Sequence, residues 1–225
     1  ELIFKKAFGN IIKIRHNETN LSFSAPNQWS LVRAETFSSK EPETLNWIDS
    51  FEDNFTFWDI GANLGLYSIY AGLAKKNLNI FSFEASFLNL ELLSRNIFIN
   101  NLQSKVAIIP LALSNKNEIN NFYMSSLEWG SAESSFGENH GHDGNTLDVK
   151  FSYRMPSFDI DTIIKTLKLS DPNALKIDVD GIEHLILSGA SKLLKSKSLR
   201  HILIEVNDEF NFQKKSIESI LRKNK

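Results

Sequence analysis

The sequence contains no cysteine. Disulfide bonds, thiolate nucleophiles and cysteine-ligated zinc or iron–sulfur sites are therefore excluded. It also has no apolar run of about 18 residues, the length that a membrane-spanning helix needs. The segment Glu1–Lys6 lacks the pattern of a secretory signal peptide. From these absences we expect a cytoplasmic protein without a membrane span.

Neither sign of charge dominates, because 25 Lys and Arg residues stand against 27 Asp and Glu residues, for a formal net charge of −2. This balance gives no electrostatic reason to bind nucleic acid. Of the 225 residues, 42% are hydrophobic and 23% are charged, which excludes disorder as the main state of the chain. The length fits one α/β domain with a small extension.

Strand and helix patterns alternate along most of the chain. Short apolar runs predict strands at 55–60, 78–83, 106–109, 175–179 and 201–206. Apolar residues at helical spacing predict helices at 66–73, 90–97, 160–167, 182–193 and 217–221. Strands that alternate with helices require a mostly parallel central sheet with helices on both faces, so the predicted fold class is α/β.

The N-terminal part does not follow this alternation. Short runs at 10–15 and 21–24 predict strands, and Pro42 opens a helix. We therefore expect residues 1–53 to form a β/helix extension that braces or covers the site of residues 54–225.

One later segment also lacks periodicity. Residues 124–149 form a long polar stretch with four glycines, at 130, 137, 141 and 144, and a stretch of this kind is either functional or disordered. Residues 150–155 are typical of an extra strand.

A glycine-rich turn follows the first strand of the alternating part. A parallel sheet binds ligands beyond the carboxyl ends of its strands, and Asp59-Ile60-Gly61-Ala62-Asn63-Leu64-Gly65 lies at such an end. The glycines permit a sharp turn and let backbone N–H groups approach a ligand. Their spacing departs from the G-x-G-x-x-G dinucleotide fingerprint, which favours a ligand whose first contact is not a diphosphate. An ordinary tight βα turn is the alternative.

The next strand ends at an acid, Glu84, which stands 25 residues after Asp59. A carboxylate at this place can accept hydrogen bonds from two ribose hydroxyls and would repel a 2′-phosphate. A solvated carboxylate at a strand end is the simpler alternative.

Three further acids, Asp178, Asp180 and Glu183, follow the strand at 175–179 within six positions. Several carboxylates buried together are costly unless a cation, hydrogen-bond donors or raised pKa values compensate. These acids are candidate catalytic residues, although Glu183 could be an ordinary acid in the first turn of a helix.

The histidines offer a weaker possibility. His140-Gly141-His142-Asp143 has the spacing of metal ligands, but it lies in the polar stretch and has no thiolate partner. We expect no bound metal.

Several motifs together resemble the FkbM-type family of class I S-adenosylmethionine-dependent methyltransferases. The order and spacing agree over about residues 40–210 for DIGANLGLYS (59–68), Phe83-Glu84, Ala112-Leu113-Ser114, Ile160-Asp161, LKIDVDGIE (175–183), LSGA (187–190) and IEVN (204–207). The resemblance implies a Rossmann-like sandwich and methyl transfer, usually onto a hydroxyl oxygen of a glycan or other natural product.

The resemblance also implies roles for single residues. The implied cofactor-binding set is Asp59, Gly61, Ala62, Asn63, Gly65, Glu84, Ala112 and Asp178. In that set the loop from Asp59 to Gly65 lies under the methionine part of S-adenosyl-L-methionine, and Glu84 holds the ribose. A hydroxyl acceptor must also lose its proton, and our hypothesis assigns this to Asp180 or Glu183, with Asp178 near the transfer site and His184 as a weaker candidate.

Three departures from the family pattern stand out. Ala85 follows Glu84 where the family usually has proline, and Asp180 stands where glutamate is more common. Class I methyltransferases also add two strands after the helix that ends near Arg222 here. We therefore expect either a natural chain that continues or a sheet that ends early with an exposed apolar edge.

Two other functions stay open. The chain could be a catalytically impaired module that still binds S-adenosylmethionine. It could also be an NAD-dependent oxidoreductase, although it lacks both G-x-G-x-x-G and a Tyr-x-x-x-Lys pair.

Overall fold

The computed structural model describes residues 10–224, so Glu1–Lys6, on which the expectation of no leader depended, lie outside the described residues. At its centre is a five-stranded sheet in the order β11-β10-β3-β4-β5, with every pair parallel. The strands are β3 (Thr56–Ile60), β4 (Asn79–Phe83), β5 (Val106–Ile109), β10 (Ala174–Ile177) and β11 (His201–Ile204).

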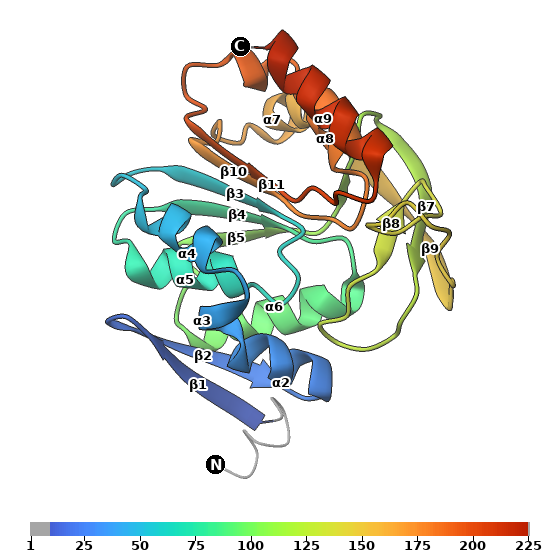
Figure 1. The fold of residues 1–225 in the computed structure, drawn as a ribbon. Coiled ribbons are helices and arrows are strands. Elements are labelled where there is room, and N and C mark those ends of the chain that lie inside the picture. The colour runs from blue at the N-terminus through green and yellow to red at the C-terminus, as the bar shows by residue number, and fades with distance from the viewer. Residues whose placement is uncertain (1–9, 225) are drawn as a thin grey trace.

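Helices cover both faces of this sheet (Figure 1). On one face lie α4 (Pro42–Asp49), α5 (Leu66–Ala74) and α6 (Phe87–Ile99), and on the other α7 (Ile160–Leu167), α8 (Glu183–Ser188) and α9 (Asn211–Lys223). Side chains alternate between the two cores, because Phe57 packs in the first cluster and Trp58 in the second. The predicted α/β sandwich of the Rossmann-like type is confirmed.

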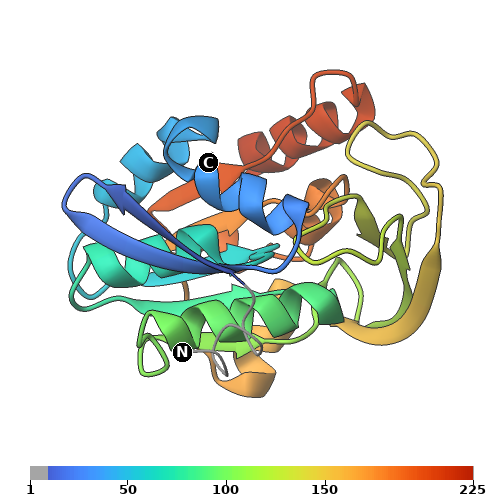
Figure 2. The same cartoon turned by 90° about the horizontal axis from the view of Figure 1, so that it is seen from below.

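The N-terminal residues pack on the first face. Strands β1 (Asn10–His16) and β2 (Thr19–Ala25) form an antiparallel hairpin, and α2 (Gln28–Glu35) and α3 (Phe37–Lys40) follow. Figure 2 shows the hairpin lying across α5 and α6. Its residues Leu21 and Phe23 belong to the same hydrophobic cluster as the inner side of those helices. The division at residue 53 stays a prediction.

A second, four-stranded sheet lies beyond the carboxyl ends of the central strands (Figure 1). Its order is β6-β9-β7-β8, with β6 (Ala112–Leu113), β7 (Glu118–Met124), β8 (Ser134–Phe136) and β9 (Phe151–Phe158). The predicted strand at 150–155 therefore exists as β9. The polar stretch 124–149 contributes β8 and the loops on either side of it.

Three predicted elements end earlier than expected, and one of them is β11, which stops at Ile204 and not at residue 206. Strand β10 stops at Ile177 because the chain leaves the ladder in the turn where Asp180 has a φ of 62°. The helix predicted over 182–193 ends at Ser188 and gives way to a 3₁₀ turn, Leu193–Lys195. Asp161 accepts hydrogen bonds from the backbone N–H groups of Lys192 and Leu193, which holds that turn apart from α8.

Within residues 10–224, β11 and β5 are the two edges of the central sheet. The longest helices described, α6 and α9, have 13 residues each. None of the described helices combines the length and the apolar character that crossing a bilayer requires.

Candidate active site

The ends of the central strands place four residues in a row. The last residues of β11, β10, β3 and β4 are register partners. The residues that follow them are Glu205, Asp178, Gly61 and Glu84. Because the strands are parallel, this row lies along the carboxyl edge of the sheet, where α/β sheets bind ligands.

Gly61 makes the close approach of β3 and β10 possible. It has a φ of 80°, and a Cβ atom added to it would lie 1.8 Å from the carbonyl oxygen of Asp178. The next turn residue, Asn63, has a φ of 50°. Gly65, with a φ of 88°, then begins α5, and a Cβ there would lie 2.5 Å from a methyl group of Leu93. Both glycines are therefore required by backbone conformation and by space.

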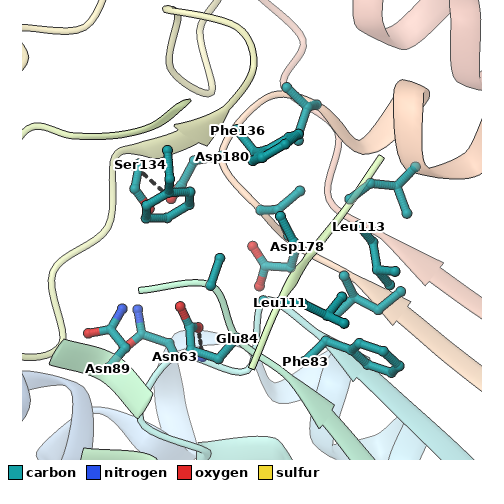
Figure 3. A pocket seen from close by; sticks show the side chains of 18 of the residues that line it. Asn63, Phe83, Glu84, Asn89, Leu111, Leu113, Ser134, Phe136, Asp178 and Asp180 are labelled. Carbon is teal, nitrogen blue, oxygen red and sulfur yellow. Dashed lines mark hydrogen bonds between the residues drawn. The ribbon is translucent and has the colours of Figure 1, made fainter. Parts of the chain in front are cut away.

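One cavity opens on the Glu84 side of the row, with an empty volume of about 560 Å³, within the range of small-molecule sites. Figure 3 shows Asn63, Glu84 and Asn89 on one side of it and Asp180 with Ser134 across from them. Its apolar wall includes Phe83, Leu111, Ala112, Leu113, Phe122, Phe136, Ile182 and Ile186. The cavity is thus apolar at one end and polar at the other.

Glu84 is only 7% exposed. Its Oε2 accepts a hydrogen bond from the backbone N–H of Asn63 at 2.7 Å, and its Oε1 accepts one from Ser86 at 2.8 Å. Burial raises the pKa of the carboxyl to about 7, although these two donors favour the ionised form. Glu84 therefore joins the β4 end to the glycine turn and faces the cavity.

A second, larger cavity lies on the Glu205 side, with an empty volume of about 1010 Å³ that includes its open mouth. Its lining is rich in charge: Arg33, Lys40, Glu41, Glu133, His142, Lys176 and Glu205. Gly61, Asn63, Asp178 and Asp180 line both cavities. The two cavities therefore meet at these four residues, which we call the junction.

The two junction aspartates differ in ionisation. Burial opposes the charge on Asp178, but the Lys176 ammonium, 2.5 Å from its Oδ2, together with a hydrogen bond to Glu205 and the charge of Lys40, holds its pKa below the usual range. Burial and the nearby Asp178 carboxylate raise the pKa of Asp180 to about 6. Lost hydration and the Asp178 carboxylate also raise the pKa of Glu205, to about 9. Of this pair, Glu205 therefore binds a proton more readily than Asp178 does.

Asp180 is held by the polar loop. Its Oδ2 accepts hydrogen bonds from the backbone N–H groups of Glu133 at 2.9 Å and Ser134 at 3.4 Å. In the part of the chain that the structure describes, the hydrogen bonds to this carboxylate reach Oδ2 alone. Its Oδ1 is therefore the oxygen left for a ligand.

The structure does not bring every predicted site residue to the cavities. Asp59 is 1% exposed, lines neither cavity, and accepts a hydrogen bond from Ser68 Oγ at 2.6 Å beneath the turn. Glu183 is fully buried and also lines neither. Its carboxylate accepts hydrogen bonds from the backbone of Val179 and Gly181 and from the Gln213 amide at 2.5 Å.

Of the remaining predicted residues, some line a cavity and others do not. Ala112 lines the first cavity and Ala62 the second, whereas Gly65 lines neither. His184 is buried beside Phe210 and Phe212 and lines neither cavity. Among residues 10–224, no group of three or more His, Cys, Asp or Glu side chains is arranged to hold a metal ion.

Sequence reasoning missed Lys176 and Asn89 as site residues. Lys176 had a visible signal, since it is a charged residue inside the otherwise apolar run from Ala174 to Ile177. Asn89 had none, because an asparagine in a helix gives no sign that its side chain bonds a loop 41 residues away.

The family model of the methyltransferase FkbM domain matches residues 59–224. No curated protein matches the chain. Among solved structures, precorrin-6y C5,15-methyltransferase from Geobacter metallireducens GS-15 is 18% identical, with 85% of this chain and 71% of that chain covered and a TM-score of 0.48. TYW2 from M. jannaschii, crystallised with AdoMet, is 12% identical, with 95% and 73% covered and a TM-score of 0.47.

The methyltransferase FkbM from Methylobacillus flagellatus KT is also 18% identical, with a TM-score of 0.48. The similarity covers 77% of this chain but 37% of that one, so the chain spans little more than a third of that relative. The family match, by contrast, spans most of this chain and includes the glycine turn, Glu84 and both junction aspartates. The resemblance read from the motifs is confirmed: the chain belongs to the methyltransferase FkbM domain family.

Proposed function

We propose that the protein transfers a methyl group from S-adenosyl-L-methionine to a hydroxyl oxygen of a glycan or other natural product. The observation that carries this proposal is the junction, where an apolar cavity with a buried acid meets a polar, charged cavity. A methyltransferase needs such a pair of sites, because donor and acceptor must meet in line.

The residues of the first cavity fit this cofactor. Its apolar wall, with Leu111 and Leu113, suits an adenine ring. Glu84 has one N–H donor on each oxygen and keeps acceptor capacity for ribose hydroxyls. The loop from Gly61 to Asn63 would lie beside the methionine part. When bound, S-adenosylmethionine supplies a methyl group activated by its positive sulfur.

The second cavity suits a polyhydroxylated acceptor. Its carboxylates and cations offer both acceptors and donors to hydroxyl groups, and Tyr67 and Phe37 add aromatic faces. The formal net charge of −2 continues to disfavour nucleic acid as the acceptor.

Asp180 is the proposed general base. It lines both cavities, and its pKa of about 6 is suited to proton removal near neutral pH. Its Oδ1 would accept the hydroxyl proton while Oδ2 stays bonded to the loop. Glu183, the other candidate, is fully buried and bonded to the turn, so we do not propose it for this role.

Calorimetry and a transfer assay test this function. We expect wild-type protein to bind S-adenosylhomocysteine and not NADH, and to methylate members of a panel of polyols and glycans. Asp180→Asn should keep that binding and lose about a hundredfold or more in transfer rate, the scale of a general base. Asp171→Asn, a change at an exposed aspartate that bonds Ser196 and Ser198, is the matched control.

Failure to bind S-adenosylhomocysteine would refute the proposal as a whole. Binding without transfer to any acceptor would favour the impaired binding module instead. Full turnover by Asp180→Asn would refute only the assignment of the base.

A further inference from the structure

We propose that Lys176 is a positioning residue of this site: its ammonium group holds Asp178 as an ionised and oriented carboxylate at the junction. This inference rests on the proposed function only in that the junction is where donor and acceptor meet. Although Lys176 is among the residues that line the second cavity, the role we propose for it is exerted through Asp178.

The position of Lys176 is unusual for a lysine. It lies inside β10, which is paired on both sides, and it is 1% exposed. A fully buried lysine is rare unless it is paired. Its Nζ lies 2.5 Å from Asp178 Oδ2, 4.0 Å from Asp59 Oδ1 and 5.0 Å from the centroid of the Tyr67 ring. The ammonium group therefore has two carboxylates and one aromatic ring as neighbours.

A polar chain beneath the turn holds the lysine in place. Lys176 and Asp59 are register partners, and so are Asp59 and Ser82 on the next strand. Ser68 of α5 donates to Asp59 Oδ2 at 2.6 Å and bonds Ser82 at 2.7 Å. Asp59, predicted as a cofactor residue, is thus the more distant carboxylate partner of the ammonium group, and Asp178 is the nearer one.

Asp178 needs this cation because its other neighbours are mostly acids. Asp180 and Glu183 face it from the turn and α8, and Asp59 faces it from β3. Glu205, at the end of β11, instead favours the ionised form of Asp178 through a side-chain hydrogen bond. One more cation, Lys40 of α3, acts on it from an exposed position. Glu41 and Tyr67 interact with the Lys176 ammonium group. Without Lys176, burial and the carboxyl groups of Asp59, Asp180 and Glu183 would therefore raise the pKa of Asp178.

A lysine that merely filled the core with an ion pair would contribute to stability alone. The proposal differs because it predicts a change at Asp178 in protein that is still folded. Matched variants are Lys176→Met, which removes the charge at similar length, and Lys176→Arg, which keeps it. Lys105→Met is the control, since Lys105 is a partly buried lysine that bonds the carbonyl oxygens of Gly72 and Lys75 far from the site.

The first test uses ligand-free protein. In carbon-13 NMR of labelled aspartate, with the Asp178 carboxyl assigned through Asp178→Asn, wild-type Asp178 should titrate below the usual aspartate range. In Lys176→Met its midpoint should rise by about one pH unit or more, the effect of losing a close opposite charge. Lys176→Arg and Lys105→Met should keep the wild-type midpoint. An unmoved midpoint in Lys176→Met overturns the proposal.

The second test is a double-mutant cycle on binding of S-adenosylmethionine at pH 7.5. Asp178→Asn and Lys176→Met should each weaken binding by about tenfold, the scale of one charge-assisted contact. The double variant should be no weaker than Asp178→Asn alone, because the lysine acts through the aspartate. Additive losses would overturn the inference.

Two further outcomes keep the test decisive. If Lys176→Met does not fold, Lys176→Arg carries the test, and a midpoint shifted by about one unit with the charge retained overturns the proposal. If wild-type protein binds no S-adenosylmethionine, the proposed function fails, and the NMR titration still decides the role of Lys176.

Discussion

At the scale of single residues, the junction requires glycine at position 61, because the backbone of Asp178 occupies the space that a side chain would need. Gly61→Ala would combine a left-handed backbone with a Cβ atom 1.8 Å from the Asp178 carbonyl oxygen, so β3 and β10 would have to separate. We expect a loss of unfolding free energy of about 3 kcal/mol or more, measured by urea denaturation.

Gly137→Ala is the control for this prediction. Gly137 has a similar φ of 76°, but the atom nearest to an added Cβ is Asn120 Nδ2 at 3.5 Å, which is ordinary contact. The control should therefore cost only the left-handed conformation, about 1 kcal/mol. Equal losses in the two variants would show that crowding at Gly61 is absent.

The motifs predicted the location of the site better than they predicted the role of each residue in it. The motifs located Gly61, Glu84 and Asp180, because a glycine turn and acids after strands are local features. They did not reveal that Glu183 is fully buried, since one of its partners is Gln213, 30 residues away in the chain. A carboxylate's role depends on its partners, and long-range partners leave no local pattern.

At the scale of elements, two asparagines of helix α6 form hydrogen bonds to two separate segments of the chain. Asn89 accepts a hydrogen bond from the Gly130 N–H at 2.9 Å and so holds the polar loop over the first cavity. Asn96, two turns later, accepts from the Ser24 N–H at 2.7 Å and so holds β2. Each asparagine should control the local opening of its own segment.

Amide hydrogen exchange tests whether each asparagine stabilises only its own segment. In Asn89→Ala the amide of Gly130 should exchange about tenfold faster or more, because a buried loop anchor is lost, while Ser24 stays protected. Asn96→Ala should show the reverse and serves as the matched control. Equal acceleration at both amides in either variant would mean that α6 loosens as a whole.

Elements that are buried on both faces were predicted from the sequence more readily than exposed ones. Strands β3, β4 and β10 were found because both faces of each are covered, which makes them short continuous apolar runs. Strand β7 was missed since most of its residues are exposed or half-buried, so apolar alternation is weak. Helix α2 was missed because Trp29 and Val32 are exposed, although its capping box, formed by Asn27 and Ser30, is a local signal of a helix start.

At the scale of the whole molecule, the site concentrates acids whose pKa values are raised by burial. The pKa is raised to about 7 for Glu84 and Glu183 and to about 6 for Asp180. Each raised acid binds its proton more tightly in the folded state than in the unfolded state. Its contribution to stability is therefore complete below the unfolded pKa and is lost as the pH rises through the folded one.

Other titrating groups do not reverse this direction. The lowered pKa values of Asp143, Asp159, Asp178 and Asp208 belong to carboxylates that act only in more acid solution, below about pH 4. The pKa of His184 is lowered by burial, which adds stability as the pH rises through the range of free histidine. One histidine opposes these three acids, so the acids determine whether stability rises or falls with pH near neutrality.

We therefore expect the ligand-free protein to lose on the order of 3 kcal/mol of unfolding free energy between about pH 5 and pH 8, measured by urea denaturation. Glu183→Gln should reduce that slope, since an amide in place of the fully buried carboxyl cannot ionise. Asp208→Asn, a change at an exposed acid paired with Lys214, should leave the slope as it is. Stability that stayed level or rose over this range would show that the buried acids are ionised at little cost, because of cations or water that reach the site.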